Sequence, residues 1–149
     1  QFFAGEKPWC QKDVDIVMPC ATQNDVDIND AKKIVANGIK YYIEVANMPT
    51  TNEALKYLLE QKNMIVSPSK AVNAGGVSVS ALEMSQNSER LFWDGEEVDK
   101  WLHKIMKGIH DGSAAAAERY GLGYDLVAGA NLVGFEKVAD AMIKQGRAL

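Results

Sequence analysis

The chain has 149 residues, of which 47% are hydrophobic and 24% charged, and its formal net charge is −4. These values predict one domain with a sizeable core, and they argue against disorder, nucleic-acid binding and binding to an anionic membrane. No apolar run approaches the roughly 20 residues that span a bilayer. The two cysteines lack metal-ligand spacing, so we expect reduced thiols, no disulfide and a cytoplasmic protein.

The first residues, Gln1-Phe2-Phe3, look like neither an initiator segment nor a signal peptide. A signal peptide needs a basic stretch followed by a long apolar run, and this start has neither. We therefore expect a fragment cut from a longer protein.

Three short apolar runs in the first half are predicted strands, at residues 14–18, 41–45 and 64–66. The first run stops at Pro19, which cannot donate to a sheet ladder, and the third is followed by Pro68. Helical patterns separate the runs. Strand and helix thus alternate, which favours parallel strands joined by crossover helices and the α/β class.

Two helices are predicted between these strands. The first opens at Asn29 or Asp30 and ends at Gly38, a typical residue after a helix C-terminus. The second opens with a capping box of Thr50 and Glu53.

From Val77 onward the pattern is wholly helical. One predicted helix has its apolar face at Val98, Leu102, Ile105, Met106 and Ile109. The last predicted helix opens near Asn131 and ends near Gly146. Its predicted buried stripe is Leu132, Phe135, Val138, Ala139, Met142 and Ile143.

Each predicted strand leads into a loop with amide, hydroxyl or glycine residues. In an open parallel sheet, ligands bind beyond the carboxyl ends of the strands, where these loops lie. Their neutral groups suit a ribose, a carboxamide or a carboxylate, although turn and cap roles account for them equally well. The residues are Thr22, Gln23 and Asn24, then Asn47, Thr50 and Thr51, then Asn73, Gly75 and Gly76.

Gly75 and Gly76 are expected just before a helix, where glycine lets the backbone approach a ligand closely and offers N–H groups to negative charge. Ser80 would face the same place from the first turn. Alternatively, Ser80 and Glu83 form the capping box of a later helix start.

Other chemical motifs are incomplete. Gly121 and Gly123 form a G-x-G, but the third glycine of the dinucleotide fingerprint is replaced by Leu126 and no strand precedes them. A dinucleotide-binding domain would therefore be represented here only by the half without the pyrophosphate turn. His103 and His110 lie too far apart for the i, i+4 zinc arrangement, and no G-x-S-x-G elbow occurs, so we expect no metal site and no nucleophilic serine.

Six motifs follow one another at consistent spacing over nearly the whole chain: Asp15-Ile16-Val17-Met18-Pro19-Cys20-Ala21-Thr22-Gln23-Asn24, Ala46-Asn47-Met48-Pro49-Thr50-Thr51, Asn73-Ala74-Gly75-Gly76-Val77, Leu82-Glu83-Met84, Ala128-Gly129-Ala130-Asn131 and Val138-Ala139-Asp140-Ala141-Met142. Together they closely resemble the hexameric glutamate dehydrogenases of bacteria and fungi. The resemblance implies a homohexameric parent enzyme that reversibly converts L-glutamate to 2-oxoglutarate and ammonium with NAD or NADP. It implies that residues 1–149 form a single partial domain, the second half of a Rossmann-like dinucleotide-binding domain followed by C-terminal helices.

By motif position, the resemblance also implies roles for individual residues. Cofactor-binding residues would be Cys20, Ala21, Thr22, Asn47 and Asn73. Substrate-binding residues would be Val77 and Ser80, with Ser80 bonding the γ-carboxylate.

The family's catalytic lysine and aspartate have no counterpart in the matching segments, and Lys70 belongs to the third loop instead. The catalytic substrate domain is therefore expected to be absent and the fragment inactive. Val45 departs from the family, where glycine often stands, as do Val79 and Ala81 beside Ser80. A non-catalytic α/β ligand-binding or regulatory module is the alternative. The open sheet edge predicts dimers or aggregation of the fragment.

Overall fold

The computed structural model describes residues 4–146 except 11 and 12, and it leaves out the side chain of Cys10. The unusual start at Gln1-Phe2-Phe3 lies outside the described residues. Two compact units divide the chain, residues 1–69 and residues 70–149. Within the described residues, no helix is both long and apolar enough to cross a membrane.

The first unit is built on a parallel sheet with the strand order β1-β2-β3. The strands are β1 (Ile16–Val17), β2 (Tyr41–Ile43) and β3 (Ile65–Ser67), and the connections contain α1 (Ile28–Ala36) and α2 (Asn52–Leu59). A short 3₁₀ helix, η1 (Pro8–Cys10), precedes them. The prediction of an α/β unit with parallel strands is therefore confirmed, with strands shorter than the apolar runs.

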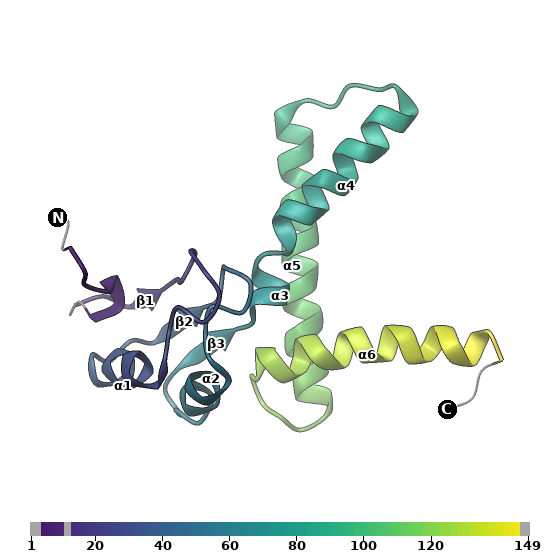
Figure 1. Cartoon of the computed structure of the whole chain (residues 1–149). Helices are drawn as coiled ribbons and strands as arrows, with labels where there is room; N and C mark the ends of the chain where they lie inside the picture. The colour runs from purple at the N-terminus through teal and green to yellow at the C-terminus, as the bar shows by residue number, and fades with distance from the viewer. Residues whose placement is uncertain (1–3, 11–12, 147–149) are drawn as a thin grey trace. The chain divides into compact units, whose positions relative to one another are not determined.

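One face of this sheet carries the core of the first unit. Val17, Tyr42 and Val66 stand in register on neighbouring strands, and all three are buried. Figure 1 shows α1 and α2 on the same side of the strands, where Ile34 and Leu58 complete the core. Successive side chains of a strand point to opposite faces, so the residues next to these three in each strand point to the other face of the sheet.

Both helices of this unit open differently from the prediction. Asp27 caps α1: its carboxylate accepts from the N–H groups of Asn29 and Asp30, and the Asp30 carboxylate accepts from the N–H of Asp27 in return. The expected opening at Asn29 or Asp30 was wrong because the box uses aspartate at both positions. Gly38 follows the end of α1 with φ 74°, as predicted.

The expected capping box of Thr50 and Glu53 was wrong by one residue. Thr51 caps α2 by accepting from the N–H of Ala54. The side chain of Thr50 is buried instead and shares a hydrogen bond of 2.7 Å with the hydroxyl of Tyr42. Thr50 therefore bonds Tyr42 of β2 in place of the helix N–H group that it was expected to cap.

The second unit is helical, as expected. It contains α4 (Ala74–Glu89), α5 (Gly95–Arg119) and α6 (Leu126–Lys144), while the short α3 (Ser69–Val72) begins at the last residue of the first unit. Helix α5 packs against both α4 and α6. The predicted apolar face of α5 is partly buried along its length, and its charged residues at 96–100, 104 and 107 are exposed.

The start of α4 corrects three expectations. Gly75 and Gly76 lie inside its first turn and not before the helix. A Cβ on Gly75 would stand 3.4 Å from the side chain of Leu102 on α5, which is an ordinary contact distance, so Gly75 lies where α4 faces α5. Ser80 lies in the second turn, which excludes the alternative helix start at Ser80 and Glu83.

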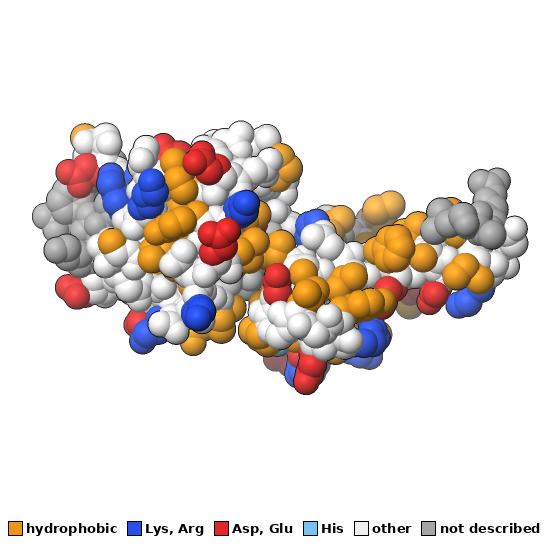
Figure 2. All heavy atoms as spheres, turned by 90° about the horizontal axis from the view of Figure 1, so that it is seen from below, with side chains coloured by type: hydrophobic (Ala, Val, Ile, Leu, Met, Phe, Trp, Pro, Cys, Tyr) orange, Lys and Arg blue, Asp and Glu red, His pale blue; other side chains and the backbone are white. Residues whose placement is uncertain are grey.

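Helix α6 begins five residues before the predicted Asn131, because Asp125 caps it by accepting from the N–H of Ala128. Its predicted buried stripe was partly wrong: Phe135, Val138 and Ile143 are exposed. Figure 2 shows hydrophobic side chains on the surface of this helix. Periodicity identified the helix, but it could not show which part of the stripe has a packing partner.

Candidate functional site

The loops that follow β1 and β2 lie side by side at the carboxyl end of the sheet. The carbonyl oxygen of Pro19 accepts hydrogen bonds from the N–H groups of Val45, at 3.2 Å, and Ala46, at 2.9 Å. Further along, the N–H of Asn24 donates to the carbonyl of Met48 at 3.0 Å. The structure thus brings together two of the loops expected to form a binding site.

One residue in each of these paired loops has an unusual backbone conformation. Asn24 and Met48 have φ values of 56° and 48°, in the left-handed region. Asparagine tolerates this region, whereas methionine adopts it at a cost of order 1–2 kcal/mol. A parallel bridge between Val26 and Thr50 then extends the ladder to the helix starts. The loop conformations are therefore fixed by backbone hydrogen bonds between them.

The predicted cofactor residues of the first unit lie on these paired loops. Cys20, Ala21 and Thr22 follow β1 and are exposed, and Asn47 is exposed on the loop after β2. The thiol of Cys20 is free and donates to the carbonyl of Met18 at 3.2 Å. Hydroxyl, amide and backbone groups of this kind can hydrogen-bond a ribose or a carboxamide.

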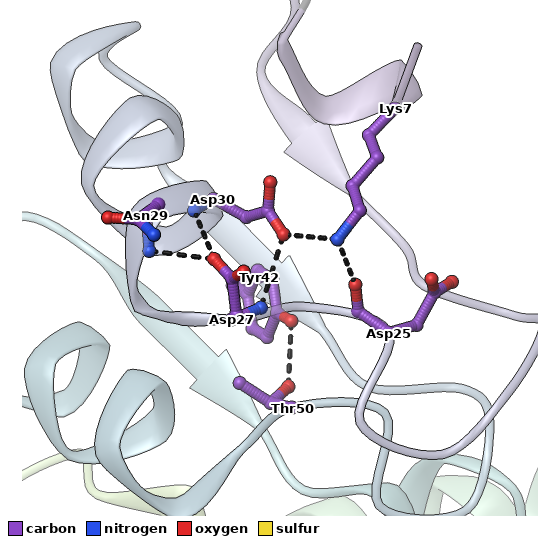
Figure 3. A network of polar contacts seen from close by, with 7 residues as sticks. All are labelled: Lys7, Asp25, Asp27, Asn29, Asp30, Tyr42 and Thr50. Atoms are coloured by element: carbon purple, nitrogen blue, oxygen red, sulfur yellow. Dashed lines mark hydrogen bonds and ion pairs between the residues drawn. The ribbon is translucent and has the colours of Figure 1, made fainter. Parts of the chain in front are cut away.

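A network of polar contacts joins the loop ends to the start of α1 and to β2 (Figure 3). The fully buried Tyr42 meets Thr50 there, and burial raises the pKa of the Tyr42 phenol, with the nearby charge of Glu44 contributing in the same direction. Lys7 donates to the carbonyl of Asp25 at 2.7 Å and to the carboxylate of Asp30 at 2.5 Å.

Hydrogen bonds in this network shift two further pKa values. The hydrogen bond to Asp30 raises the pKa of Lys7. The N–H of Asp30 lowers the pKa of the Asp27 carboxyl. Both shifts favour the charged forms of Lys7 and Asp27, whose hydrogen bonds hold the start of α1.

Sequence reasoning overlooked two buried side chains, Tyr42 in β2 and Glu44 directly after it. Tyr42 and Glu44 are two residues apart, so both point to the helix-covered face, and both are buried. The carboxylate of Glu44 accepts from the N–H of Ser69 at 3.3 Å, at the start of α3. A charged residue at the end of an otherwise apolar strand was the available signal.

The remaining predicted residues belong to the second unit. Asn73 immediately precedes α4, while Val77 and Ser80 are exposed on that helix. Their spacing of three places Val77 and Ser80 on one helix face. The structure therefore presents these two side chains together.

Two other residues considered in the sequence have structural partners. Lys70 donates to the side-chain oxygen of Asn131 at 2.5 Å. His110 lies 2.6 Å from the hydroxyl of Tyr124 and 3.0 Å from Asp111. Over the described part of the chain, no group of three His, Cys, Asp or Glu residues is arranged to hold a metal ion.

The sequence pattern of the glutamate/leucine/phenylalanine/valine dehydrogenases matches residues 1–146. The chain belongs to this family. It is 77% identical over 146 residues to the NAD-specific glutamate dehydrogenase of Clostridium symbiosum, a match that covers 98% of the chain and 32% of that protein. It is 49% identical over 151 residues to the NADP-specific glutamate dehydrogenase of Haemophilus influenzae, which covers 98% of the chain and again 32% of the relative.

The fold also matches solved structures. One glutamate dehydrogenase structure aligns with a TM-score of 0.95 and 76% sequence identity, over 100% of the chain and 33% of its own length. Plasmodium falciparum glutamate dehydrogenase 2 aligns with a TM-score of 0.91 and 49% identity, over 99% of the chain and 32% of its own. The chain thus spans about a third of the length of the relatives it matches.

Proposed function

We propose that this chain is part of an enzyme that reversibly converts L-glutamate to 2-oxoglutarate and ammonium with NAD or NADP. The observation that carries the proposal is the pair of hydrogen-bonded loops with Cys20, Ala21, Thr22 and Asn47, in a chain of this dehydrogenase family. NAD or NADP supplies the hydride acceptor for such a reaction. The paired loops fit it because they offer exposed neutral hydrogen-bonding groups at the carboxyl end of a parallel sheet.

The first unit, in this proposal, is the second half of a Rossmann-like dinucleotide-binding domain. Cys20, Ala21, Thr22 and Asn47 line the nicotinamide and ribose side, and Asn73 serves the carboxamide. The absence of a complete G-x-G-x-x-G from the sequence supports this assignment, because the other half of such a domain carries the pyrophosphate turn. The upstream coding sequence tests it: a strand followed by G-x-G-x-x-G supports the assignment, and its absence contradicts it.

Val77 and Ser80 form the substrate side in this proposal. Val77 contacts the aliphatic part of glutamate and the Ser80 hydroxyl donates to the γ-carboxylate. Their exposure on one face of α4 supports this role. The proposed parent is a homohexamer in the cytoplasm, and its general acid and base lie outside this chain.

Initial-rate assays of the 149-residue chain and of the full-length parent, with glutamate and NAD or NADP, test the proposal. We expect coenzyme reduction by the parent only, because hydride transfer requires all reacting groups in one geometry. A parent that does not reduce either coenzyme with glutamate would disprove the proposed reaction. Turnover by the chain itself would disprove the placement of the catalytic groups.

Ser80→Ala in the parent tests the substrate residue. Removing a hydrogen bond to a charged group should raise the glutamate KM by about tenfold or more. Ser85→Ala is the matched control, since Ser85 is an exposed serine of the same helix that bonds the carbonyl of Ala81. An unchanged KM in Ser80→Ala, or an equal rise in both variants, would remove Ser80 from the site.

A further inference from the structure

Glu44 is a buried carboxylate for which the proposed function has so far assigned no role. It follows β2 directly and is only 4% exposed. Taking a carboxylate out of water is costly unless hydrogen bonds compensate it, so a buried glutamate at this place needs a structural or functional reason.

The hydrogen bonds of Glu44 connect the ends of two strands. Its N–H donates to the carbonyl of Ser67, the last residue of β3, at 3.1 Å. Its carboxylate accepts from the N–H of Ser69 at 3.3 Å. Main chain and side chain of one residue thus hold the backbone on both sides of Pro68.

Glu44 and the Ser69 that it contacts both lie close in sequence to residues of the proposed site. Asn47 follows Glu44 by three residues on the second loop, and Ser69 precedes Asn73 by four residues on the third. Tyr42, two residues before Glu44 and on the same face, hydrogen-bonds Thr50 at the far end of the second loop. Tyr42 in β2 and Glu44 directly after it are therefore two buried side chains that hydrogen-bond different parts of the loops.

We infer that Glu44 is a positioning residue, which fixes the start of the third loop relative to the second so that both can serve one coenzyme. The inference rests on the proposed function for the identity of the ligand. Glu44 itself touches no reacting atom in this role. It acts through the backbone of Ser69.

Amide hydrogen exchange of the 149-residue chain tests the structural half of the inference without any activity. Glu44→Ala should accelerate exchange at the amide of Ser69 by about tenfold or more, because that N–H loses its acceptor. Glu44→Gln should restore most of the protection, since its side-chain oxygen still accepts a hydrogen bond. Glu53→Ala, an exposed carboxylate on α2, is the control and should leave the amide of Ser69 unchanged.

Kinetics of the full-length parent test the functional half. Glu44→Ala should raise the KM for NAD or NADP about tenfold, equivalent to about 1.4 kcal/mol, and Glu44→Gln should largely rescue it. A residue that merely stabilised the fold would lower the midpoint of unfolding while the remaining folded enzyme kept its coenzyme KM. If Glu44→Ala fails to fold, Glu44→Asp replaces it, because the shorter side chain withdraws the acceptor while keeping the charge.

Unchanged exchange at Ser69 in a folded variant, or an unchanged coenzyme KM, overturns the inference and leaves the proposed reaction standing. A wild-type parent without glutamate-dependent coenzyme reduction overturns the proposed reaction, and the exchange experiment then still decides whether Glu44 holds Ser69.

Discussion

The crossing of α5 and α6 depends on Gly129. A Cβ at this position would lie 1.9 Å from the carbonyl oxygen of Ser113 and 3.3 Å from the Cβ of Ala117, both on α5. Since a Cβ essentially never approaches a backbone atom within 3.0 Å, α6 would have to move by about 1 Å or more. The absence of a Cβ at position 129 therefore allows the two helices to pack closely.

Gly129→Ala should therefore destabilise the second unit. Overpacking costs about 1–3 kcal/mol, and the better helix propensity of alanine recovers only about 1 kcal/mol at most. Gly134→Ala is the matched control on the same helix, because a Cβ there meets no atom within 4 Å. It should stabilise the protein by about 0.5–1 kcal/mol.

Urea unfolding followed by far-UV circular dichroism measures both variants against the wild type. The two changes should shift the midpoint in opposite directions. If Gly129→Ala were as stable as Gly134→Ala, the close helix crossing would be wrong.

Three further predictions concern the polar network of Tyr42, Thr50 and Asp27. Tyr42→Phe leaves the buried hydroxyl of Thr50 without its partner and should lower the free energy of unfolding by about 1–2 kcal/mol. The double variant Tyr42→Phe/Thr50→Val should lose less stability than the two single variants together, which a double-mutant cycle by urea unfolding measures. The pKa of Tyr42 is raised from 10.0, so this phenol ionises first in the unfolded state, and the stability of the protein should fall as pH rises above about 10. Tyr42→Phe should show a weaker fall, and identical alkaline stability profiles of the variant and the wild type would contradict this. The pKa of Asp27 is lowered from 3.8, so its contribution to stability is present above that pH and is lost as pH falls through the pKa of the folded state. Asp27→Asn should reduce this loss of stability in acid, measured by unfolding at a series of pH values, and an unaltered acid profile would exclude Asp27 as its source.

The sequence predicted the elements better than their ends. Apolar runs and proline punctuation located all three strands and their parallel order, because crossover helices leave few other arrangements. The ends failed where tertiary partners compete with local ones. Thr50 matched a capping signature but bonds Tyr42, and α6 could begin before Asn131 because Asp125 caps it.

The candidate site was predictable only as a set of loops. The rule that ligands bind beyond the carboxyl ends of parallel strands led to the two loops that Pro19 now joins. The charge of Glu44 at the end of an apolar run was visible in the sequence, but its contact with Ser69, 25 residues away, was not. Likewise, the need for glycine at position 129 becomes visible only when the second helix is in place.

Hydrogen exchange of the full-length parent, with and without coenzyme, tests most directly whether these loops form one side of a coenzyme site. NAD or NADP should slow exchange in residues 19–25 and 45–50 together, and also around Asn73. Protection of these segments, with α6 unaffected, is the predicted result. Coenzyme binding that leaves both paired loops unprotected would contradict the proposed site.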